Sequence, residues 1–345
     1  MSPVKQAFIM KKKIQIAGLL LLILAGCVKA HPVARLELPK DILADQDGHC
    51  ARGDCQNGKE APKNKKAVEN VFIYNDGSTY TGEFSKGFFH GNGKLVLKNG
   101  RSFAGKFVGG VYVGGGTVVI PGQYKGKCSP NSNCFNGHGI LVLDDGRLFS
   151  GTFVNGLLNG RGTIQLADKT KKTGWFVNNK LEGKGRVTTE SGTSYRGFFE
   201  DGKKNGVFTF LFATGSKFKG IFKNDKYYKD GVLTFPNGIT GKCLKGDCIN
   251  GQGVLSLSDG GHYQGGFLDG RKHGKGTFVS ADGAMYKGSY YHGKRDGRGM
   301  YIFPSGIKFV GQYKKGKRNG RGVYIFANGR KHSVYYEDGV LKRNE

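Results

Sequence analysis

Residues 263–285 have the sequence YQGGFLDGRKHGKGTFVSADGAM, and residues 286–308 continue with YKGSYYHGKRDGRGMYIFPSGIK. Both stretches begin with aromatic-x-Gly-x-aromatic, continue with a turn and a Gly-x-Gly pair, and end in an apolar run and a second turn. Alternate residues of a β-strand share one face, so the two aromatics and the glycine between them lie on the same side. The pattern therefore predicts a β-hairpin in which glycine leaves room for a neighbouring ring.

The same unit recurs along most of the chain. Its central glycine returns every 21–25 residues, at Gly82, Gly105, Gly126, Gly151, Gly174, Gly197, Gly220, Gly241, Gly265, Gly288 and Gly311. A single hairpin buries too little surface to be stable, whereas stacked hairpins share a continuous row of rings. The sequence therefore predicts an all-β protein, an elongated, solenoid-like, twisted antiparallel sheet of about 11–13 successive β-hairpin repeats.

The composition agrees with this fold class. The 345 residues include 60 glycines, and Gly destabilises helix interiors. Only 8 prolines are present, without a G-x-y run, which excludes collagen, and the 12% aromatic content is not that of a disordered chain.

The pattern resembles the MORN repeat, typically Tyr-x-Gly-x-Phe-x-x-Gly-x-x-x-Gly-x-Gly over about 23 residues. Residues 80–93, 263–276 and 286–299 match it closely, and the resemblance covers about residues 80–331. It implies a long sheet of successive hairpins, and it associates the chain with acidic phospholipids and with protein scaffolding. Phe208 and Lys229 replace paired glycines, so units 195–217 and 218–238 are expected to be the least regular, with a bend there.

The aromatics that flank the central glycines are candidates for a groove that contacts a protein partner. They are Tyr80, Phe84, Phe103, Phe107, Tyr124, Phe149, Phe153, Tyr195, Phe199, Phe218, Phe222, Tyr263, Phe267, Tyr286, Tyr290, Phe309 and Tyr313.

Six of the seven cysteines form three local pairs, Cys50/Cys55, Cys128/Cys134 and Cys243/Cys248. The first cysteine of each pair is assigned to the place of the second aromatic of other repeats, with its partner across the same hairpin turn. In an oxidising compartment this spacing favours three local disulfides. A metal site is the alternative, but the spacing does not match C-x-x-C pairs and no histidine recurs with the cysteines.

The seventh cysteine ends an export signal. Lysines at 11–13 precede an apolar run, and Leu24-Ala25-Gly26-Cys27 resembles a bacterial lipobox. The resemblance implies cleavage before Cys27, with diacylglycerol on its thiol and a further acyl chain such as palmitate on its amine. The alternative is a simple secretory signal with an incidental cysteine. Val28, rather than aspartate, favours the outer over the inner membrane, and the start at Met1 or Met10 is left open.

These features divide the chain into five parts. We expect a lipoprotein signal peptide at 1–26, the lipidated cysteine and a flexible tether at 27–45, an atypical first repeat with an insertion at 46–79, the repeat array at 80–331, and a truncated last repeat or cap at 332–345. Terminal units of a solenoid are expected to be atypical.

Lysine and arginine outnumber aspartate and glutamate by 54 to 26, and removal of residues 1–26 changes the net charge from +28 to +24. Many of these cations fall in turns, where they are candidates for contact with an anionic surface. They include Lys203, Lys204, Arg271, Lys272, Lys294, Arg295, Lys314, Lys315, Lys317 and Arg318. Solvation of the turns and protection of sheet edges is the simpler explanation for part of this charge.

The sequence therefore predicts a non-enzymatic, lipid-anchored MORN-repeat protein of the bacterial envelope that acts as a protein-interaction scaffold at a membrane. The alternative is a surface that binds polyanions, acidic lipid or lipopolysaccharide through the basic turns. An enzyme with a site within the repeats is the third hypothesis. No catalytic residue, metal or cofactor is predicted, nucleic acid is not an expected partner of an exported chain, and a homodimer is left open.

Overall fold

The computed structural model describes residues 48–56 and 70–344, all of which belong to the unit Asp41–Glu345. The predicted signal peptide, Cys27 and the tether lie outside the described residues, as does the segment 57–69 of the predicted insertion.

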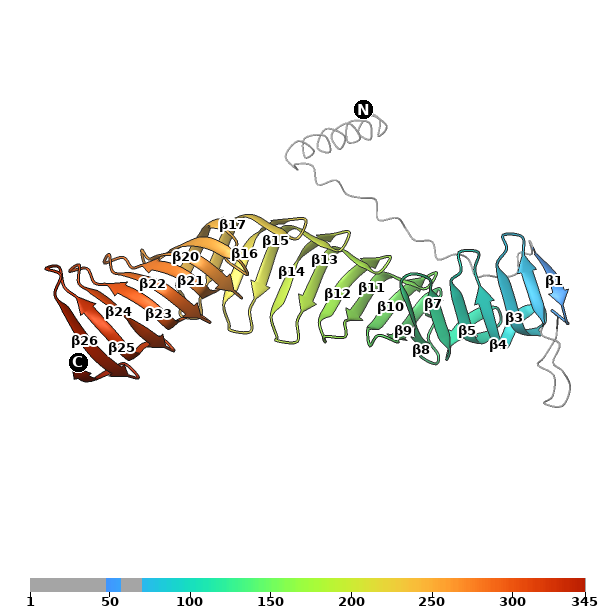
Figure 1. Ribbon diagram of the computed structural model, residues 1–345. Helices are drawn as coiled ribbons and strands as arrows, with labels where there is room; N and C mark the ends of the chain where they lie inside the picture. The colour runs from blue at the N-terminus through green and yellow to red at the C-terminus, as the bar shows by residue number, and fades with distance from the viewer. Residues whose placement is uncertain (1–47, 57–69, 345) are drawn as a thin grey trace, which may run out of the picture. The chain divides into compact units, whose positions relative to one another are not determined.

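The described residues form one open antiparallel sheet of 27 strands, without a helix (Figure 1). The all-β sheet of successive hairpins is thereby confirmed. The first strands are β1 (Gly48–Arg52), β2 (Val71–Tyr74), β3 (Thr79–Ser85), β4 (Phe88–Val96), β5 (Ser102–Val108), β6 (Val111–Gly114), β7 (Thr117–Ile120), β8 (Tyr124–Cys128) and β9 (Gly137–Leu143). The middle strands are β10 (Leu148–Val154), β11 (Leu157–Gln165), β12 (Lys171–Val177), β13 (Lys180–Thr188), β14 (Ser194–Glu200), β15 (Lys203–Leu211), β16 (Lys217–Lys223), β17 (Lys226–Thr234) and β18 (Thr240–Gly246). The last strands are β19 (Gln252–Leu257), β20 (His262–Leu268), β21 (Arg271–Val279), β22 (Met285–Tyr291), β23 (Lys294–Ile302), β24 (Lys308–Lys314), β25 (Lys317–Ile325), β26 (Lys331–Glu337) and β27 (Val340–Asn344).

Each strand pairs with its neighbours in sequence, as β12 pairs with β11 and β13. One exception is the pair β6 and β7, which both pair with β5. In a regular repeat a strand of seven residues is followed by one of nine, as in β12 and β13. The repeats therefore add to one another along a single direction of the sheet.

Each seven-residue strand of a regular repeat shifts its register beside the central glycine. In β10 the shift lies between Gly151 and Phe153, and the φ of Gly151 is 145°. A Cβ atom at Gly151 would lie 2.5 Å from the carbonyl oxygen of Arg161. Only glycine adopts this backbone at so close an approach.

The second glycine of the Gly-x-Gly pair lies beneath an aromatic ring. A Cβ atom at Gly299 would lie 2.5 Å from Cζ of Tyr286, and one at Gly276 would lie 2.6 Å from the ring of Tyr263. The expectation that glycine makes room for a ring is confirmed. We call the face that carries these rings the inner face, and the opposite one the outer face.

Three disulfide bonds close short loops of the described chain. They join Cys50 to Cys55, Cys128 to Cys134 and Cys243 to Cys248, each with a Cα–Cα distance of 6.0 Å.

The register of the disulfide repeats corrects the sequence alignment. Cys128 pairs with Leu141, the place that the leading aromatic takes in a regular repeat, as Tyr80 pairs with Leu95. The sequence alignment had assigned the cysteine to the second aromatic, by counting from Gly126. That count fails here because the pairing of β8 with β7 and its pairing with β9 differ by two residues from each other. The same leading place is taken by Cys50, opposite Phe72, and by Cys243, opposite Leu255.

The second cysteine of the pair then covers a glycine, as a ring does elsewhere. A Cβ atom at Gly139 would lie 3.0 Å from Sγ of Cys134, and one at Gly253 would lie 2.9 Å from Sγ of Cys248. Sulfur therefore fills the space above the glycine in these repeats.

The irregularity expected around residues 195–238 falls mainly on β17. Its pairing with β16 contains two register shifts, on either side of Ile221, and its pairing with β18 spans only Gly231 to Thr234. Lys229, which replaces a paired glycine, lies opposite Ile221. Lys229 takes the place of the first glycine of the pair, which has a positive φ in regular repeats, as Gly274 does at 66°.

Candidate functional site

The repeat aromatics form the hydrophobic core instead of an accessible groove. Apart from Tyr124 and Tyr195, which are half-buried, every predicted groove aromatic is buried, and Tyr263 and Tyr286 are 0% and 1% exposed. These rings are covered because each one packs on its own repeat and on the next. The expectation that they line a contact surface for a partner is therefore corrected.

Edge-to-face ring pairs connect one repeat to the next. The centroids of Tyr286 and Tyr313 lie 5.1 Å apart with an interplanar angle of 85°, and those of Tyr263 and Tyr290 lie 5.3 Å apart at 85°. Such pairs stabilise by about 0.5–1.5 kcal/mol beyond the area that they bury. The row of rings therefore couples the stability of neighbouring repeats.

Four of the predicted anionic-surface contacts belong to this inner ring stack, which is a second correction. Lys204, Lys272, Arg295 and Arg318 hold the second position of the nine-residue strand, which faces the rings. In earlier repeats the same position is apolar, as in Phe89 and Leu181. The sequence carries a signal for this placement, since the position recurs every 23 residues.

Arg318 shows how such a cation is held. Its guanidinium lies 4.8 Å from the ring centroid of Phe309, and Nη1 donates a hydrogen bond of 2.8 Å to Oη of Tyr324. Lys204 also has a carboxylate partner, because its Nζ lies 2.9 Å from Asp225. Ring faces attract cations by about 0.5–2 kcal/mol. These side chains therefore act mainly within the core.

The electrostatics of this stack follow from burial. Burial lowers the pKa of Lys272 to about 8, Asp259 opposes the shift and Arg295 adds to it. The ammonium also lies 3.6 Å from the ring centroid of Phe278, a contact that favours the charged form. Burial raises the pKa of Tyr286 to about 12, so this hydroxyl stays protonated at neutral pH.

The other predicted contacts stay at the surface. Arg271 is half-exposed, and the exposed ones are Lys203, Lys294, Lys314, Lys315 and Lys317.

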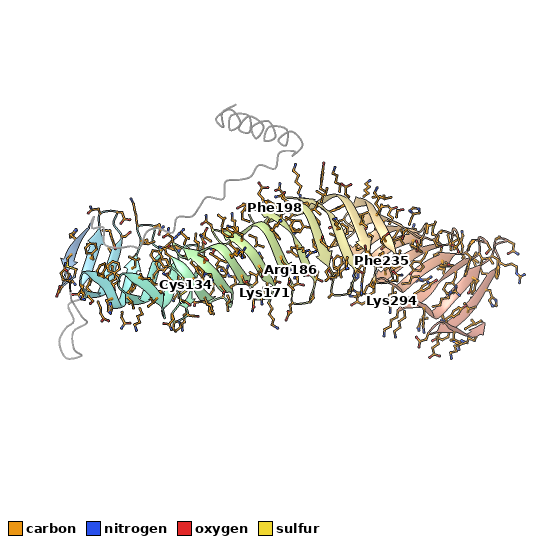
Figure 2. The ribbon with its side chains drawn as sticks, turned by 180° about the vertical axis from the view of Figure 1, so that it is seen from behind. Cys134, Lys171, Arg186, Phe198, Phe235 and Lys294 are labelled. Carbon is orange, nitrogen blue, oxygen red and sulfur yellow. A yellow bond between two sulfur atoms is a disulfide. The ribbon has the colours of Figure 1, made fainter. Side chains whose placement is uncertain are left out.

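A larger set of exposed cations lies on the outer face and was missed by the focus on turns. They alternate with inner-face residues along the strands, and include Arg161, Lys171, Lys184, Arg186, Arg196, Lys217, Lys219, Lys242, Lys275, Lys287, Arg298, Lys308, Arg321 and Lys331. Figure 2 labels Lys171 on β12 and Arg186 on β13. The period-two alternation in the sequence is the signal that would have found them.

The inner face of early repeats is covered by turns of later repeats. Arg101 donates a hydrogen bond of 3.0 Å to the carbonyl of Asn155, and Oη of Tyr124 donates one of 2.6 Å to the carbonyl of Gly156. Ile120 and Phe212, on the same side, are each 2% exposed. The corresponding residues of the last repeats are less covered.

The last repeats present partly exposed rings on the inner face. Tyr301, Phe303 and Tyr324 are half-buried against the core, and Phe326 is 39% exposed. They lie on or directly after strands β23 and β25, near the C-terminal end of the sheet (Figure 1). Sequence analysis did not single out these four residues, because they stand in the apolar run after the Gly-x-Gly pair.

A cleft of about 910 Å³ opens where β17 and β18 separate. Tyr227 and Tyr228 line it, together with lysine and aspartate side chains such as Lys245 and Asp247. Oη of Tyr227 accepts a hydrogen bond of 2.9 Å from the backbone N–H of Gly231, which holds the ring at the margin of the gap.

Two searches of the described residues gave no candidates. Residues 48–56 and 70–344 contain no group of three or more His, Cys, Asp or Glu side chains placed to hold a metal ion. Within the same ranges no helix has the length and apolar character needed to cross a membrane.

Comparison with family models finds the MORN repeat in seven places. The matched residues are 80–100, 149–171, 174–194, 195–217, 263–285, 286–308 and 309–329. The chain therefore contains MORN repeats. The gaps 101–148 and 218–262 hold two of the disulfide units, whose register is offset. The comparison with curated proteins found no match.

Several solved structures resemble the chain at low identity. The TCP10 domain of Danio rerio CPAP, in complex with a peptide of Danio rerio STIL, is 11% identical over 83% of this chain and 99% of that domain, with a TM-score of 0.20. The SAS-4 (dCPAP) TCP domain of Drosophila melanogaster, in complex with a proline-rich motif of Ana2 (dSTIL), is 12% identical over 57% and 88%, with a TM-score of 0.18. Virginiamycin B lyase from Staphylococcus aureus is 8% identical over 77% and 83%, with a TM-score of 0.11. These TM-scores carry no argument about function.

Proposed function

We propose that this protein is a non-enzymatic, lipid-anchored scaffold of a bacterial envelope, which docks a protein partner on the inner face of its last repeats. The proposal combines the MORN repeats with the lipobox resemblance at Cys27. A row of stacked repeats offers an extended surface, as solenoid proteins do.

One observation carries the docking role. Phe303 and Phe326 occupy successive repeats on the inner face, where the equivalent residues Ile120 and Phe212 are buried. Partly exposed aromatic side chains are the residues that most often anchor a protein interface. This proposal moves the docking surface from the core aromatics that the sequence suggested to these two rings and their neighbours.

The docking proposal is tested with the full chain, produced with its disulfides formed. The double variant Phe303→Ser and Phe326→Ser is compared with Val310→Ser, which changes an exposed apolar side chain of the outer face. Chemical cross-linking in envelope membranes should give a defined adduct that the double variant loses and the control keeps. The adduct partner, purified, should bind with the same dependence. An adduct pattern that is identical in all three proteins, with equal thermal unfolding, would refute docking at this face.

The lipid anchor has its own test. Cys27→Ser removes the thiol that the lipobox resemblance assigns to diacylglycerol, so the protein should lose incorporation of labelled palmitate and leave the membrane fraction. Two or more acyl chains are needed for stable anchoring, at about 0.8 kcal/mol for each buried CH₂ group. Unchanged labelling in Cys27→Ser would contradict this part of the proposal.

The exposed cations of the outer face support a second candidate function, binding to acidic lipid or another polyanion. Each Lys or Arg near an anionic membrane adds about 1 kcal/mol, and the attraction falls within a Debye length. We expect the full chain to bind vesicles containing anionic lipid with an affinity that falls steeply with salt. Salt-independent binding, or equal binding to neutral vesicles, would contradict this candidate.

A further inference from the structure

One position on the outer face is occupied by aromatic instead of polar residues in the middle of the array. The residue after the central glycine is polar in most repeats, as in Glu83, Thr152 and Gln312. In two successive repeats it is instead Trp175, 39% exposed, and Phe198, 48% exposed. These two side chains are not part of the core, and neighbouring exposed rings are a feature of binding surfaces.

The strand register arranges these rings and two cations in one row. Arg161 pairs with Trp175 between β11 and β12, and Lys184 pairs with Phe198 between β13 and β14. The order of these residues across four adjacent strands is therefore cation, ring, cation, ring. Between β12 and β13 the register shifts, so that Trp175 pairs with Glu182, two residues from Lys184. Because neighbouring strands are about 4.8 Å apart, the two strands that carry the rings, β12 and β14, are separated by about 9.6 Å.

The ring of Phe198 is directed across the neighbouring strand. A Cβ atom at Gly183 would lie 4.0 Å from Cε2 of Phe198, so the ring extends toward the β13 backbone. A ring held against the sheet offers its free face for stacking. Glu182, the carboxylate paired with Trp175, accepts a hydrogen bond of 2.9 Å from the backbone N–H of Asp201. It is thereby engaged with the adjacent turn.

A second row of cations runs beside the first. Arg186 on β13 and Arg196 on β14 pair directly with each other and are exposed. Each lies two residues from a member of the first row, so both rows share the outer face. The guanidinium groups can donate paired hydrogen bonds to a carboxylate.

We propose that the row Arg161, Trp175, Lys184 and Phe198, with Arg186 and Arg196 beside it, binds a linear anionic glycan that carries one carboxylate per disaccharide. The spacing of the two strands that carry the rings is close to the length of a disaccharide in an extended chain. The apolar faces of alternate sugars stack on Trp175 and Phe198, which removes apolar surface from water. The carboxylates between them meet the cations.

The geometry favours a glycan over a bilayer. Arginine and lysine side chains of the same strands extend farther from the sheet than a phenylalanine that lies against it. At a bilayer these cations would contact the lipid headgroups first, and the rings would not reach the hydrocarbon. A flexible linear polymer, in contrast, reaches both the rings and the cations.

The sole tryptophan of the chain makes the test direct, because intrinsic fluorescence reports on Trp175 alone. The full chain, solubilised through its anchor in a neutral detergent, is titrated with a hyaluronan octasaccharide as the probe. The emission of Trp175 should change in a saturable way, with an affinity that falls with salt. Maltooctaose, neutral and of the same length, should give no saturation at the same concentrations.

Variants separate the glycan site from general charge attraction. Calorimetry should show about tenfold weaker hyaluronan binding for Phe198→Ala. The matched control Tyr291→Ala removes an aromatic that is 59% exposed elsewhere and should bind as the parent does. Lys184→Ala should weaken binding more than Lys308→Ala, an exposed outer-face lysine with the same charge change.

Three outcomes would overturn the proposal. The first is equal binding of Phe198→Ala and Tyr291→Ala. The second is polyglutamate binding as tight as hyaluronan, which would mean attraction to any polyanion. The third is a shift of Trp175 emission with anionic vesicles but not with hyaluronan, which would identify a membrane-facing surface.

Discussion

Replacement of Gly299 by alanine should destabilise the C-terminal repeats, because the new methyl group meets a ring that has no free space. A Cβ atom there would lie 2.5 Å from Cζ of Tyr286, which is 1% exposed. Tyr290 and Tyr313 each hold that ring at a centroid distance of 5.1 Å. Overpacking of this kind costs about 1–3 kcal/mol, and we expect the upper half of that range.

The assay is urea unfolding followed by circular dichroism, combined with amide exchange of β22 to β25. The control is Gly306→Asn, at a turn glycine with φ 83° and no atom near its Cβ direction. Asparagine tolerates this conformation, so the control should lose less than about 0.5 kcal/mol. Because repeat arrays unfold in parts, exchange is needed to place the loss in the affected repeats.

A double-mutant cycle tests the cause. In the background Tyr286→Ala the ring is absent, so the addition of Gly299→Ala should cost less than about 0.5 kcal/mol. If Gly299→Ala is neutral in the parent protein, or costs the same with and without the ring, then the fit of ring to glycine does not explain the repeated glycine.

Three further outcomes are expected. Cys128→Ser with Cys134→Ser should lower the free energy of unfolding by about 2 kcal/mol through lost loop constraint, and an unchanged urea midpoint would contradict this. Arg318→Ala should lower the free energy of unfolding by about 1–2 kcal/mol, and Arg318→Met should lower it less, since methionine keeps an apolar stem among the rings. Thermal unfolding of both variants tests this, and equal losses in the two would contradict it. The pKa of Lys272 falls from 10.5 to about 8 in the folded state, so the unfolded state binds more protons between these two pH values. The free energy of unfolding should therefore rise with pH in this range. Urea midpoints measured across the range should show the rise in the parent protein and lose it in Lys272→Met.

The sequence predicted the hairpin repeat because its cause is local. Glycine beneath a ring, as at Gly276 beneath Tyr263, and turns with positive φ leave a pattern that recurs within each 23-residue unit. The inner position of Lys272 was not predicted, since charge usually indicates a solvated side chain. Only the ring faces on both sides, Tyr263 of the same repeat and Tyr290 of the next, make that position tolerable for a cation.

The disulfide repeats show a second limit of sequence analysis. Counting from Gly126 assigned Cys128 to the wrong position, because β8 is offset by two residues between β7 and β9. Register is set by the pairing of a strand with its neighbours, which a count along one strand does not include. The row of Trp175 and Phe198 was missed for a related reason, since its alternation of cations and rings runs across strands instead of along them.

The order of strand pairing gives this array a distinct response to mechanical load. Since the described strands, apart from β6 and β7, pair only with their neighbours in sequence, a force between the two chain ends opens hydrogen bonds from one edge, hairpin after hairpin. A released 23-residue unit extends by about 80 Å, so pulling should give a series of similar steps in place of one rupture. A chain held at one end by a membrane and at the other by a partner would then lengthen stepwise at a limited tension.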